Sequence, residues 1–536
     1  MYLIDQHTKK IMEECKVLAA KAGLNFDAET LEYIVTNTDM IELSPKVMIP
    51  TLYDYWVNDV EVLKGKGQYK VYPHNPYETV INSRPAISFY NDNNPDWLNV
   101  MIFYHVLGHI DFFQNNIMFE NTWNDDFVGQ ALADKRLLAD YRSKYGRWVD
   151  YIIEFSRSID NLSGYFEEMN KNNYPHDKEA PSIVDYYFNE FLQTVVKAPD
   201  HVMFNELARY NDLYDKHADV ANVLFFTEIK KKYPEFQSLF DKFLIKKQTK
   251  KPVDIMEYIR DNSKFLQNEG NSWMKSVMNV VRNTSLYFNP QIRTKIVNEG
   301  WASYWHDKLF RADKRISGHE VAFANTNAAV TSISRVGLNP YAIGLRLLQY
   351  IEDKANKGQL SYEYQRITNS QQKQDYNKNT NEGQKAIFNI RRTFSDFMLI
   401  NTFVDQEFVD LHGLFVTGMR YNPQRQTKEY YVKSRKAEDY KQMLLDSLYH
   451  PPTINVDEEK STENNLYLVH QFEGKQLVKD FIAQTMIGIE YLWGNQVQLE
   501  TTEIFAKNGA LENEDKFEYK KVLYTIKDKK VVKNNL

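Results

Sequence analysis

Apolar residues recur at helical spacing through most of this chain and at alternating spacing near its C-terminus. A period of 3.6 residues indicates amphipathic helices, whereas a period of two indicates strands with one buried face. The helical spacing predicts helices over residues 8–24, 28–44, 124–170, 183–289 (with a break near 249–252), 340–356 and 385–412. The alternating spacing predicts strands over residues 429–433, 465–469 and 497–501 and a closing hairpin over 521–532. We therefore expect a predominantly α fold, with an α-rich body over residues 1–415 and a smaller α+β domain over residues 416–536.

Local signals refine this picture. Asn94-Pro95-Asp96 predicts the start of a helix that carries two histidines, and Asn289-Pro290 precedes a helix that carries a glutamate and a histidine. Thr79-Val-Ile81 is a short strand-like run. The polar stretch 357–384 is interpreted either as a mobile insertion or, in part, as the extension of a helix. We interpret the polar segment 453–465 as a hinge in the smaller domain.

Length and composition indicate the number of folding units and the cellular compartment. A chain of 536 residues is too long for one core, so we expect two or three folding units, and an aromatic content of 14% predicts a ring-rich interior. The single cysteine, Cys15, excludes an intramolecular disulfide and a thiolate metal cluster. No run approaches the roughly 18 apolar residues of a membrane helix, and the N-terminus lacks a basic and then apolar leader pattern. We expect a cytoplasmic protein with no membrane span.

Charge argues against nucleic acid as a partner. The chain carries 66 basic and 72 acidic side chains, a net charge of −6, and it has no basic domain of the kind that nucleic-acid-binding proteins show. It contains neither a Walker motif nor a G-x-G-x-x-G loop. We therefore expect no nucleic-acid partner and no nucleotide cofactor.

The strongest chemical signal is a pair of histidines in the apolar run Phe103-Tyr-His-Val-Leu-Gly-His-Ile-Asp-Phe-Phe113. Residues four apart share one face of a helix, so His105 and His109 can bind one metal ion. Their spacing is that of H-E-x-x-H, but Val106 occupies the position of the catalytic glutamate. In the alternative interpretation both histidines are buried and hydrogen-bonded, which would require a polar partner for each ring.

A second motif, Asn298-Glu-Gly-Trp-Ala-Ser-Tyr-Trp-His306, places Glu299 and His306 on one helical face. The order Asn-Glu-Gly-Trp-Ala resembles the helix that supplies the carboxylate ligand in gluzincin metallopeptidases, although its separation from the histidine pair is longer. Glu299 would complete a His2Glu site for Zn²⁺ or for non-haem Fe²⁺, and His306 would add a fourth ligand. In the alternative interpretation, Glu299 and His306 form an internal pair that supports helix packing.

Six further residues are candidates for supporting roles. Asp111 lies two residues past His109, on another side of the helix, so we expect it to support the site or to cap rather than to bind metal. Asn325 and Asn327 either hydrogen-bond a ligand or cap the following helix. The remaining three are aromatic and either line a pocket or belong to the core: Tyr104, Trp301 and Tyr304.

Together with other segments, these motifs resemble the stage V sporulation protein R (SpoVR) family. The matching segments are Tyr77–Ala86, His105–Asn116, Asn298–His306, Ala324–Asn327, Gly337–Gly344, Leu466–Gly474 and Leu492–Gly494. They extend over nearly the whole chain. One departure is Thr51-Leu-Tyr-Asp-Tyr-Trp56, where the family usually has a His-Trp-Ser-Phe-Gly block.

The resemblance implies a role in sporulation, in spore cortex formation or in the stress response. It implies a cytoplasmic regulator that works with a PrkA-type serine kinase and a YhbH-type von Willebrand A-domain protein. The residues themselves leave a second function open, in which a metallopeptidase-like body hydrolyses a peptide or amide bond at a His2Glu site. Another carboxylate would then have to replace the base that is missing at Val106.

Overall fold

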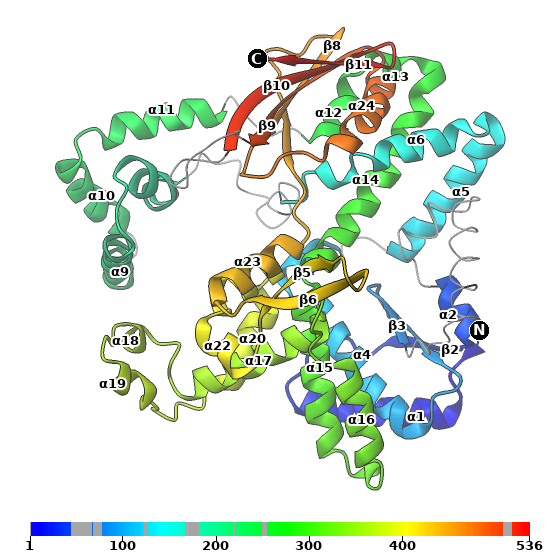
Figure 1. Cartoon of the computed structure of the whole chain (residues 1–536), viewed down its shortest axis with the longest axis vertical. Coiled ribbons are helices and arrows are strands. Elements are labelled where there is room, and N and C mark those ends of the chain that lie inside the picture. Colours follow the sequence, from blue (N-terminus) through cyan, green and yellow to red (C-terminus); the bar gives the residue numbers. More distant parts are fainter. Residues whose placement is uncertain are drawn as a thin grey trace. The chain divides into compact units, whose positions relative to one another are not determined.

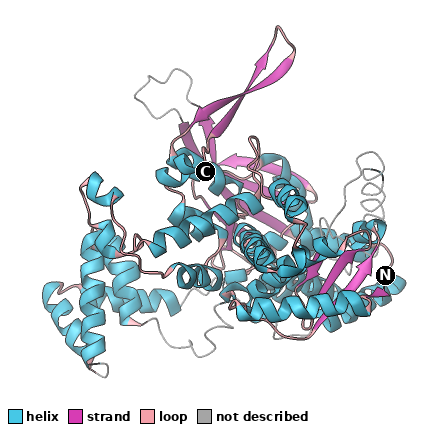
Figure 2. Ribbon diagram, turned by 90° about the horizontal axis from the view of Figure 1, so that it is seen from below, coloured by secondary structure: helices cyan, strands magenta, loops and turns pink. Residues whose placement is uncertain are grey.

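The computed structural model describes residues 2–43, 67, 78–122, 127–166, 169, 182–217, 220–248, 254–506 and 517–536. Helices predominate in this part of the chain, and a small sheet forms near the C-terminus (Figure 1). Figure 2 shows the same balance of helix and strand. These observations confirm the predominantly α fold with a smaller C-terminal sheet region. A metallopeptidase-like architecture for the body stays a prediction.

The chain forms two compact units, one of residues 1–163 with 258–536 and one of residues 164–257. The predicted boundary at 415/416 stays a prediction, because residues on both sides of it belong to the larger unit. In the described part of the chain, none of the helices has the length and apolarity needed to cross a membrane.

A four-stranded sheet begins the larger unit. Its elements are β1 (Tyr2–Leu3), α1 (Gln6–Lys21), β2 (Thr30–Val35), α2 (Asn37–Leu43), β3 (Glu78–Ile81) and β4 (Ala86–Asn91). The strand order is β1-β2-β4-β3, with β2 parallel to β4 and the other pairs antiparallel. The strand predicted at residues 79–81 is confirmed as part of β3. The helix predicted over residues 28–44 is wrong for residues 30–35, because their pairing with β4 makes them a strand.

Three helices of the larger unit carry most of the candidate residues. They are α4 (Asp96–Asn115), α15 (Lys295–Ala312) and α17 (Pro340–Asn356), and α15 contacts both of the others. The predicted starts of α4 and α17 are confirmed. Asn339 caps α17, since its side-chain oxygen accepts hydrogen bonds from two backbone N–H groups of the first turn.

α15 follows Asn289-Pro290 as predicted, but it does not begin directly after them. Pro290 lies inside α14 (Ser272–Arg293), and α15 begins at Lys295 after a break at Thr294. The buried carboxylate of Asp396 accepts hydrogen bonds from two backbone N–H groups in the first turn of α15, each of 2.9 Å. An aspartate distant in sequence therefore accepts hydrogen bonds from the free backbone N–H groups at the start of this helix, and the local sequence does not indicate this contact.

Glycines let these three helices approach closely. A Cβ atom at Gly300 on α15 would lie 2.4 Å from the carbonyl carbon of Gly344 on α17. A Cβ atom at Gly108 on α4 would lie 2.8 Å from Cα of Ala302 on α15. Both distances are shorter than real contacts of Cβ atoms, so a larger residue would force the helices apart.

Before residue 416, the other described helices of the larger unit are α5 (Phe127–Tyr145), α6 (Trp148–Arg157), α12 (Ile255–Asn262, which crosses the unit boundary), α13 (Lys264–Gln267), α16 (Glu320–Val330), α18 (Tyr362–Gln365), α19 (Ser370–Gln374), α20 (Gly383–Thr393), α21 (Asp396–Phe403) and α22 (Gln406–Leu411). Short 3₁₀ turns cover Ile117–Thr122, Asp160–Leu162, Glu269–Asn271 and Lys314–Ile316. The polar stretch 357–384 does not extend α17. It contains α18 and α19, whose N-caps are Ser361 and Asn369.

The smaller unit is helical. It contains α8 (Ile183–Asp185), a π-helix over Tyr186–Val195, α9 (Asp200–His217), α10 (Ala221–Lys232) and α11 (Phe236–Gln248). Aromatic rings dominate its core, with Tyr187, Phe191, Phe225 and Phe236 fully buried against one another. The predicted ring-rich interior is clearest in this unit.

The C-terminal elements are β5 (Val416–Asn422), β6 (Thr427–Ser434), α23 (Ala437–Ser447), β7 (Thr453–Val456), β8 (Asn465–Gln471), α24 (Lys479–Trp493), β9 (Gln496–Ala506), β10 (Phe517–Lys527) and β11 (Lys530–Asn535). The last five strands form one sheet in the order β11-β10-β9-β8-β7, in which only β8 and β9 are parallel. The strands and the closing hairpin predicted from alternation are confirmed. The segment 453–465, predicted as a hinge, begins with β7 paired to β8.

Candidate metal centre

The candidate centre lies where α4 and α15 touch. His105 and His109 are buried on one face of α4, one helical turn apart. Apolar residues surround α4 on nearly all sides, so the whole helix is buried and its few polar side chains must find partners. Because Gly108 admits the backbone of α15, Glu299 on α15 reaches the same point.

Three side-chain atoms converge at this point. Nε2 of His105 lies 3.1 Å from Nε2 of His109. Oε2 of Glu299 lies 3.5 Å from Nε2 of His109 and 3.8 Å from Nε2 of His105. Two ligand atoms of a tetrahedral Zn²⁺ site, each about 2.0–2.1 Å from the ion, are roughly 3.3 Å apart. The spacing of the three atoms therefore suits one ion between them.

The hydrogen bonds of His109 and Glu299 favour a cation here. Nδ1 of His109 lies 2.9 Å from Oδ1 of Asn298, an oxygen that can only accept, so the ring proton lies on Nδ1 and Nε2 carries a lone pair. Tyr341 hydrogen-bonds the Glu299 carboxylate. Within the described residues, however, Oε2 of Glu299 is buried without a hydrogen-bond partner. A buried carboxylate oxygen that faces an imidazole lone pair is costly unless a cation lies between them.

Burial also sets the protonation of these groups. It lowers the pKa of His105 and of His109 below the usual histidine value, which keeps the imidazoles in the neutral form that binds metals. Burial raises the pKa of Glu299 to about 7. A bound cation would favour the charged carboxylate, because opposite charges at short range stabilise the ionised form.

A cavity of about 350 Å³ adjoins the centre. Its described lining comprises Glu78, Leu98, Met101, Ile102, His105, His306, Val330, Asn339 and Tyr341. Most of the wall is apolar, and Glu78 contributes the carboxylate. The pKa of Glu78 is raised to about 7, chiefly by burial. The cavity thus places a second carboxylate near the three candidate ligands.

The sequence patterns did not indicate Glu78 or Tyr341 as residues of the site. Glu78 is the first residue of β3, inside a segment that matches the family, but a single carboxylate on a short strand has no periodic partner. Tyr341 follows the N-cap of α17, and its ring stacks on that of His105 with centroids 5.9 Å apart. A tyrosine behind a helix-starting proline shows no sign of this contact. Both residues reach the centre only through the tertiary fold.

His306 does not join the three converging atoms. Its Nδ1 lies 2.9 Å from Nδ1 of His105, on the side of that ring opposite the centre, and its Nε2 lies 2.9 Å from Oδ1 of Asn327. The prediction that Asn325 or Asn327 caps the following helix is wrong, because both lie inside α16. Asn325 is exposed, whereas Asn327 reaches His306.

The other predicted residues are not among the described residues that line the cavity. The indole N–H of Trp301 donates to Asp111 at 2.8 Å, which links α15 to α4. The carboxylate of Asp111 also accepts from the backbone N–H of Asn25 and lies 3.5 Å from the guanidinium of Arg391. Tyr304 donates to Glu352 at 2.8 Å. These contacts hold the helices together rather than line a pocket.

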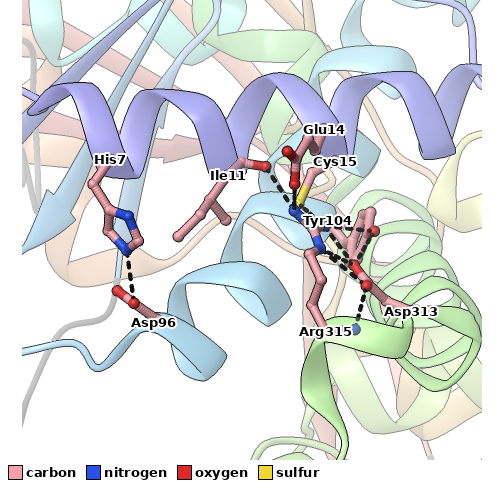
Figure 3. A network of polar contacts seen from close by, with 8 residues as sticks. All are labelled: His7, Ile11, Glu14, Cys15, Asp96, Tyr104, Asp313 and Arg315. Carbon is pink, nitrogen blue, oxygen red and sulfur yellow. Dashed lines mark hydrogen bonds and ion pairs between the residues drawn. The ribbon is translucent and has the colours of Figure 1, made fainter.

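Tyr104 belongs to a separate network beneath α1 (Figure 3). Its hydroxyl donates to the carboxylate of Asp313 at 2.7 Å. Arg315 donates to the same carboxylate, to Glu14 and to the sulfur of Cys15. Tyr104 therefore links α4 to Asp313 at the end of α15, and Arg315 links the same carboxylate to α1. Tyr104 is fully buried and is not among the described residues that line the cavity, which agrees with the core role expected for it.

The chain is mostly helical and carries a candidate His2Glu centre beside a cavity. These features make it a candidate metalloprotein. The family model described as SpoVR like protein matches residues 4–451. The chain therefore belongs to the SpoVR family, as its motifs indicated. The block Thr51–Trp56, in which it departs from the family pattern, lies outside the described residues.

One relative is the Escherichia coli (strain K12) protein named "Uncharacterized protein YcgB". It is 24% identical over 333 residues, which cover 60% of this chain and 58% of that protein. The chain thus spans less than two thirds of that relative's length. No solved structure matches the chain.

Proposed function

We propose that this protein is a metal-dependent hydrolase of amide or peptide bonds, with one Zn²⁺ or Fe²⁺ held by His105, His109 and Glu299. The observation that carries the proposal is the convergence of their three ligand atoms, 3.1–3.8 Å apart, beside a cavity that contains a further carboxylate. Three protein ligands leave coordination positions open, as in catalytic rather than structural zinc sites.

Glu78 takes the role of the missing base. The position after His105, where H-E-x-x-H enzymes carry their glutamate, holds the fully buried Val106. Glu78 enters from β3 and lines the same cavity as His105. The bound ion would polarise the scissile carbonyl and acidify a water molecule. Glu78 would take a proton from the attacking water as its oxygen bonds to the acyl carbon, and would return it to the amine as the C–N bond breaks.

The cavity walls restrict the substrate. Leu98, Met101, Ile102 and Val330 provide an apolar surface next to the candidate ligands. A volume of about 350 Å³ is at the small end of ligand pockets. We therefore expect a short amide or peptide with an apolar side chain or acyl group beside the scissile bond.

Peptide cleavage tests this function. The purified chain is loaded with Zn²⁺ or with Fe²⁺ and incubated with a library of N-acetylated tetrapeptides varied at the two central positions, and new amine termini are measured by mass spectrometry. We expect cleavage beside apolar residues. Glu78→Gln should keep its metal and lose about 100-fold or more of the rate, as expected for loss of a general base.

Glu29→Gln, at an exposed glutamate preceding β2, is the matched control and should cleave at the wild-type rate. The proposal is overturned if no peptide is cleaved by the metal-loaded protein, or if Glu78→Gln cleaves as fast as the control.

Membership of the family supports a second candidate, a regulator in sporulation or the stress response that acts in the cytoplasm. The replacement of the usual base by Val106 also favours a role without catalysis. We propose a PrkA-type serine kinase and a YhbH-type von Willebrand A-domain protein as its partners. Pull-down of each purified protein by this chain at physiological salt is the test, and binding no stronger than to an unrelated kinase would exclude that partner.

A further inference from the structure

A chain of four side chains leads from the surface of α15 to the candidate centre. It runs from Asp307 through Asn327 and His306 to His105, with successive donor–acceptor distances of 3.0, 2.9 and 2.9 Å. A carboxylate can only accept hydrogen bonds, so the Asn327 side-chain N–H group donates to Asp307. This direction fixes the orientation of the whole chain.

The positions of the protons on the two histidine rings follow by elimination. With its nitrogen committed to Asp307, Asn327 presents its oxygen to Nε2 of His306, and that nitrogen must therefore carry a proton. His306 is fully buried, which favours the neutral imidazole with a single ring proton. Its Nδ1 is then an acceptor, and the group 2.9 Å away, Nδ1 of His105, must donate to it. The proton of His105 thus lies on Nδ1, and its Nε2 carries a lone pair.

We propose that His306, Asn327 and Asp307 form a relay that fixes the tautomer of His105, so that His306 is a positioning residue and not a metal ligand. The inference rests on the metal centre in the proposed function and makes it more specific. Nδ1 of His306 is occupied by Nδ1 of His105, so a bound ion would be held by three protein residues, His105, His109 and Glu299. With three protein ligands, a bound ion would have a coordination position open for a substrate.

The relay also distinguishes the two histidines. His109 has a single partner on Nδ1, the side-chain oxygen of Asn298. His105 is held by a chain that ends in the carboxylate of Asp307, which also pairs with Arg311 at 2.9 Å, and such a chain fixes the orientation and tautomer of an imidazole ligand. Substitutions along α16 should therefore change metal affinity, although α16 contributes no ligand.

The test compares Asn327→Ala with Asn325→Ala, two residues apart on the same helix. The dissociation constant for Zn²⁺ is measured by competition with a chromogenic chelator. We expect Asn327→Ala to weaken binding by about 10- to 100-fold, as for other partners of metal-bound histidines. The exposed Asn325→Ala should bind as tightly as wild type. Melting temperatures in excess chelator verify that both variants are folded.

Coordination is read from X-ray absorption of the Zn²⁺-loaded protein. Wild type and His306→Gln should both show two imidazole ligands, and the glutamine oxygen should recover part of the affinity that His306→Leu loses. Loss of one imidazole in His306→Leu would overturn the inference, because His306 would then be a ligand. Unchanged affinity in Asn327→Ala would also overturn it.

Neither the affinity nor the X-ray absorption measurement depends on hydrolysis. If the protein binds metal but cleaves no peptide, the proposed hydrolase function is contradicted, whereas the proposed relay is not. A wild-type chain that takes up no metal would overturn both.

Discussion

Neighbouring residues on α4 serve different purposes. His105 faces the candidate centre, whereas Tyr104 belongs to the network of Asp313, Arg315 and Cys15 beneath α1 (Figure 3). Arg315 donates to the Cys15 sulfur at 3.2 Å, and burial raises the pKa of this thiol to about 11. The only cysteine of the chain is therefore buried, and its thiol stays protonated at neutral pH.

Cys15 should make stability fall at alkaline pH. Its folded pKa of about 11 lies above the ordinary value of 9.0, so its contribution is complete below pH 9 and is lost as the pH rises towards 11. Between pH 8 and pH 10.5, wild type should lose about 2 kcal/mol more of its unfolding free energy than Cys15→Ala. Urea denaturation at both pH values measures this, and equal losses in the two proteins would show that the thiol does not titrate as described.

Residue patterns predicted part of the candidate site. The spacing of His105, His109 and Glu299 on two helices was sufficient to nominate them, since helical periodicity places residues on a face. Spacing could not decide that His306 lies behind His105 instead of beside it. Nor could it separate Asn325 from Asn327, because only the packing of α16 determines which amide reaches His306 and which is exposed.

At the scale of elements, the site depends on how closely α15 approaches its neighbours. Gly300 and Gly344 face each other where α15 crosses α17, and Gly108 faces Ala302 where α15 crosses α4. Glu299 directly precedes Gly300. The position of the carboxylate is thus set by two glycine crossings rather than by any loop.

Gly300→Ala and Gly344→Ala should therefore destabilise the protein by about 1–3 kcal/mol or more, as expected for overpacking against backbone. A Cβ atom at Gly344 would lie 2.1 Å from the carbonyl oxygen of Ile296. Gly270→Ala is the control, since nothing lies within 4 Å of the added atom, and it should stay within about 0.5 kcal/mol of wild type. Denaturation midpoints provide the comparison. A stable Gly344→Ala would mean that the two helices lie farther apart than described.

Element prediction succeeded where local signals are strong. Pro340 and Asp96 mark true helix starts, and alternation predicted the C-terminal strands. It failed at β2 because Leu31, Ile34 and Val35 also have the spacing of one helical face. Pairing with β4, which is formed by a distant segment, decides the outcome there.

At the scale of the whole molecule, the two compact units have separate cores. The unit of residues 164–257 is built around Phe191 and its aromatic neighbours, and it contains none of the candidate ligands. Sequence predicted two or three folding units from length, but not this division. The helical pattern over residues 183–289 is broken near Thr249–Pro252, but this break alone does not indicate that contacts change partners near residue 257.

The two units should unfold separately. Phe191→Ala removes a fully buried ring and should destabilise the smaller unit by about 3–5 kcal/mol. Calorimetry should show two transitions, of which Phe191→Ala lowers one and added Zn²⁺ raises the other. A single transition that responds to both changes would show that the units unfold together.

Metal binding should also appear in the stability of the larger unit. His109→Ala and Glu299→Gln should each lower the melting temperature strongly with metal present and much less in excess chelator, because the lost stabilisation is that of the bound ion. Thermal scans with and without chelator measure the difference. Equal shifts under both conditions would mean that these residues only support packing.

The most direct test is the metal content of the purified chain, measured by inductively coupled plasma mass spectrometry after reconstitution and gel filtration. The account predicts about one Zn²⁺ or Fe²⁺ per chain in wild type, and strong loss in His105→Ala, His109→Ala and Glu299→Gln. His306→Gln should stay close to wild type at saturating metal. Less than about a tenth of an equivalent in wild type, or full occupancy in Glu299→Gln, would contradict a shared His2Glu centre.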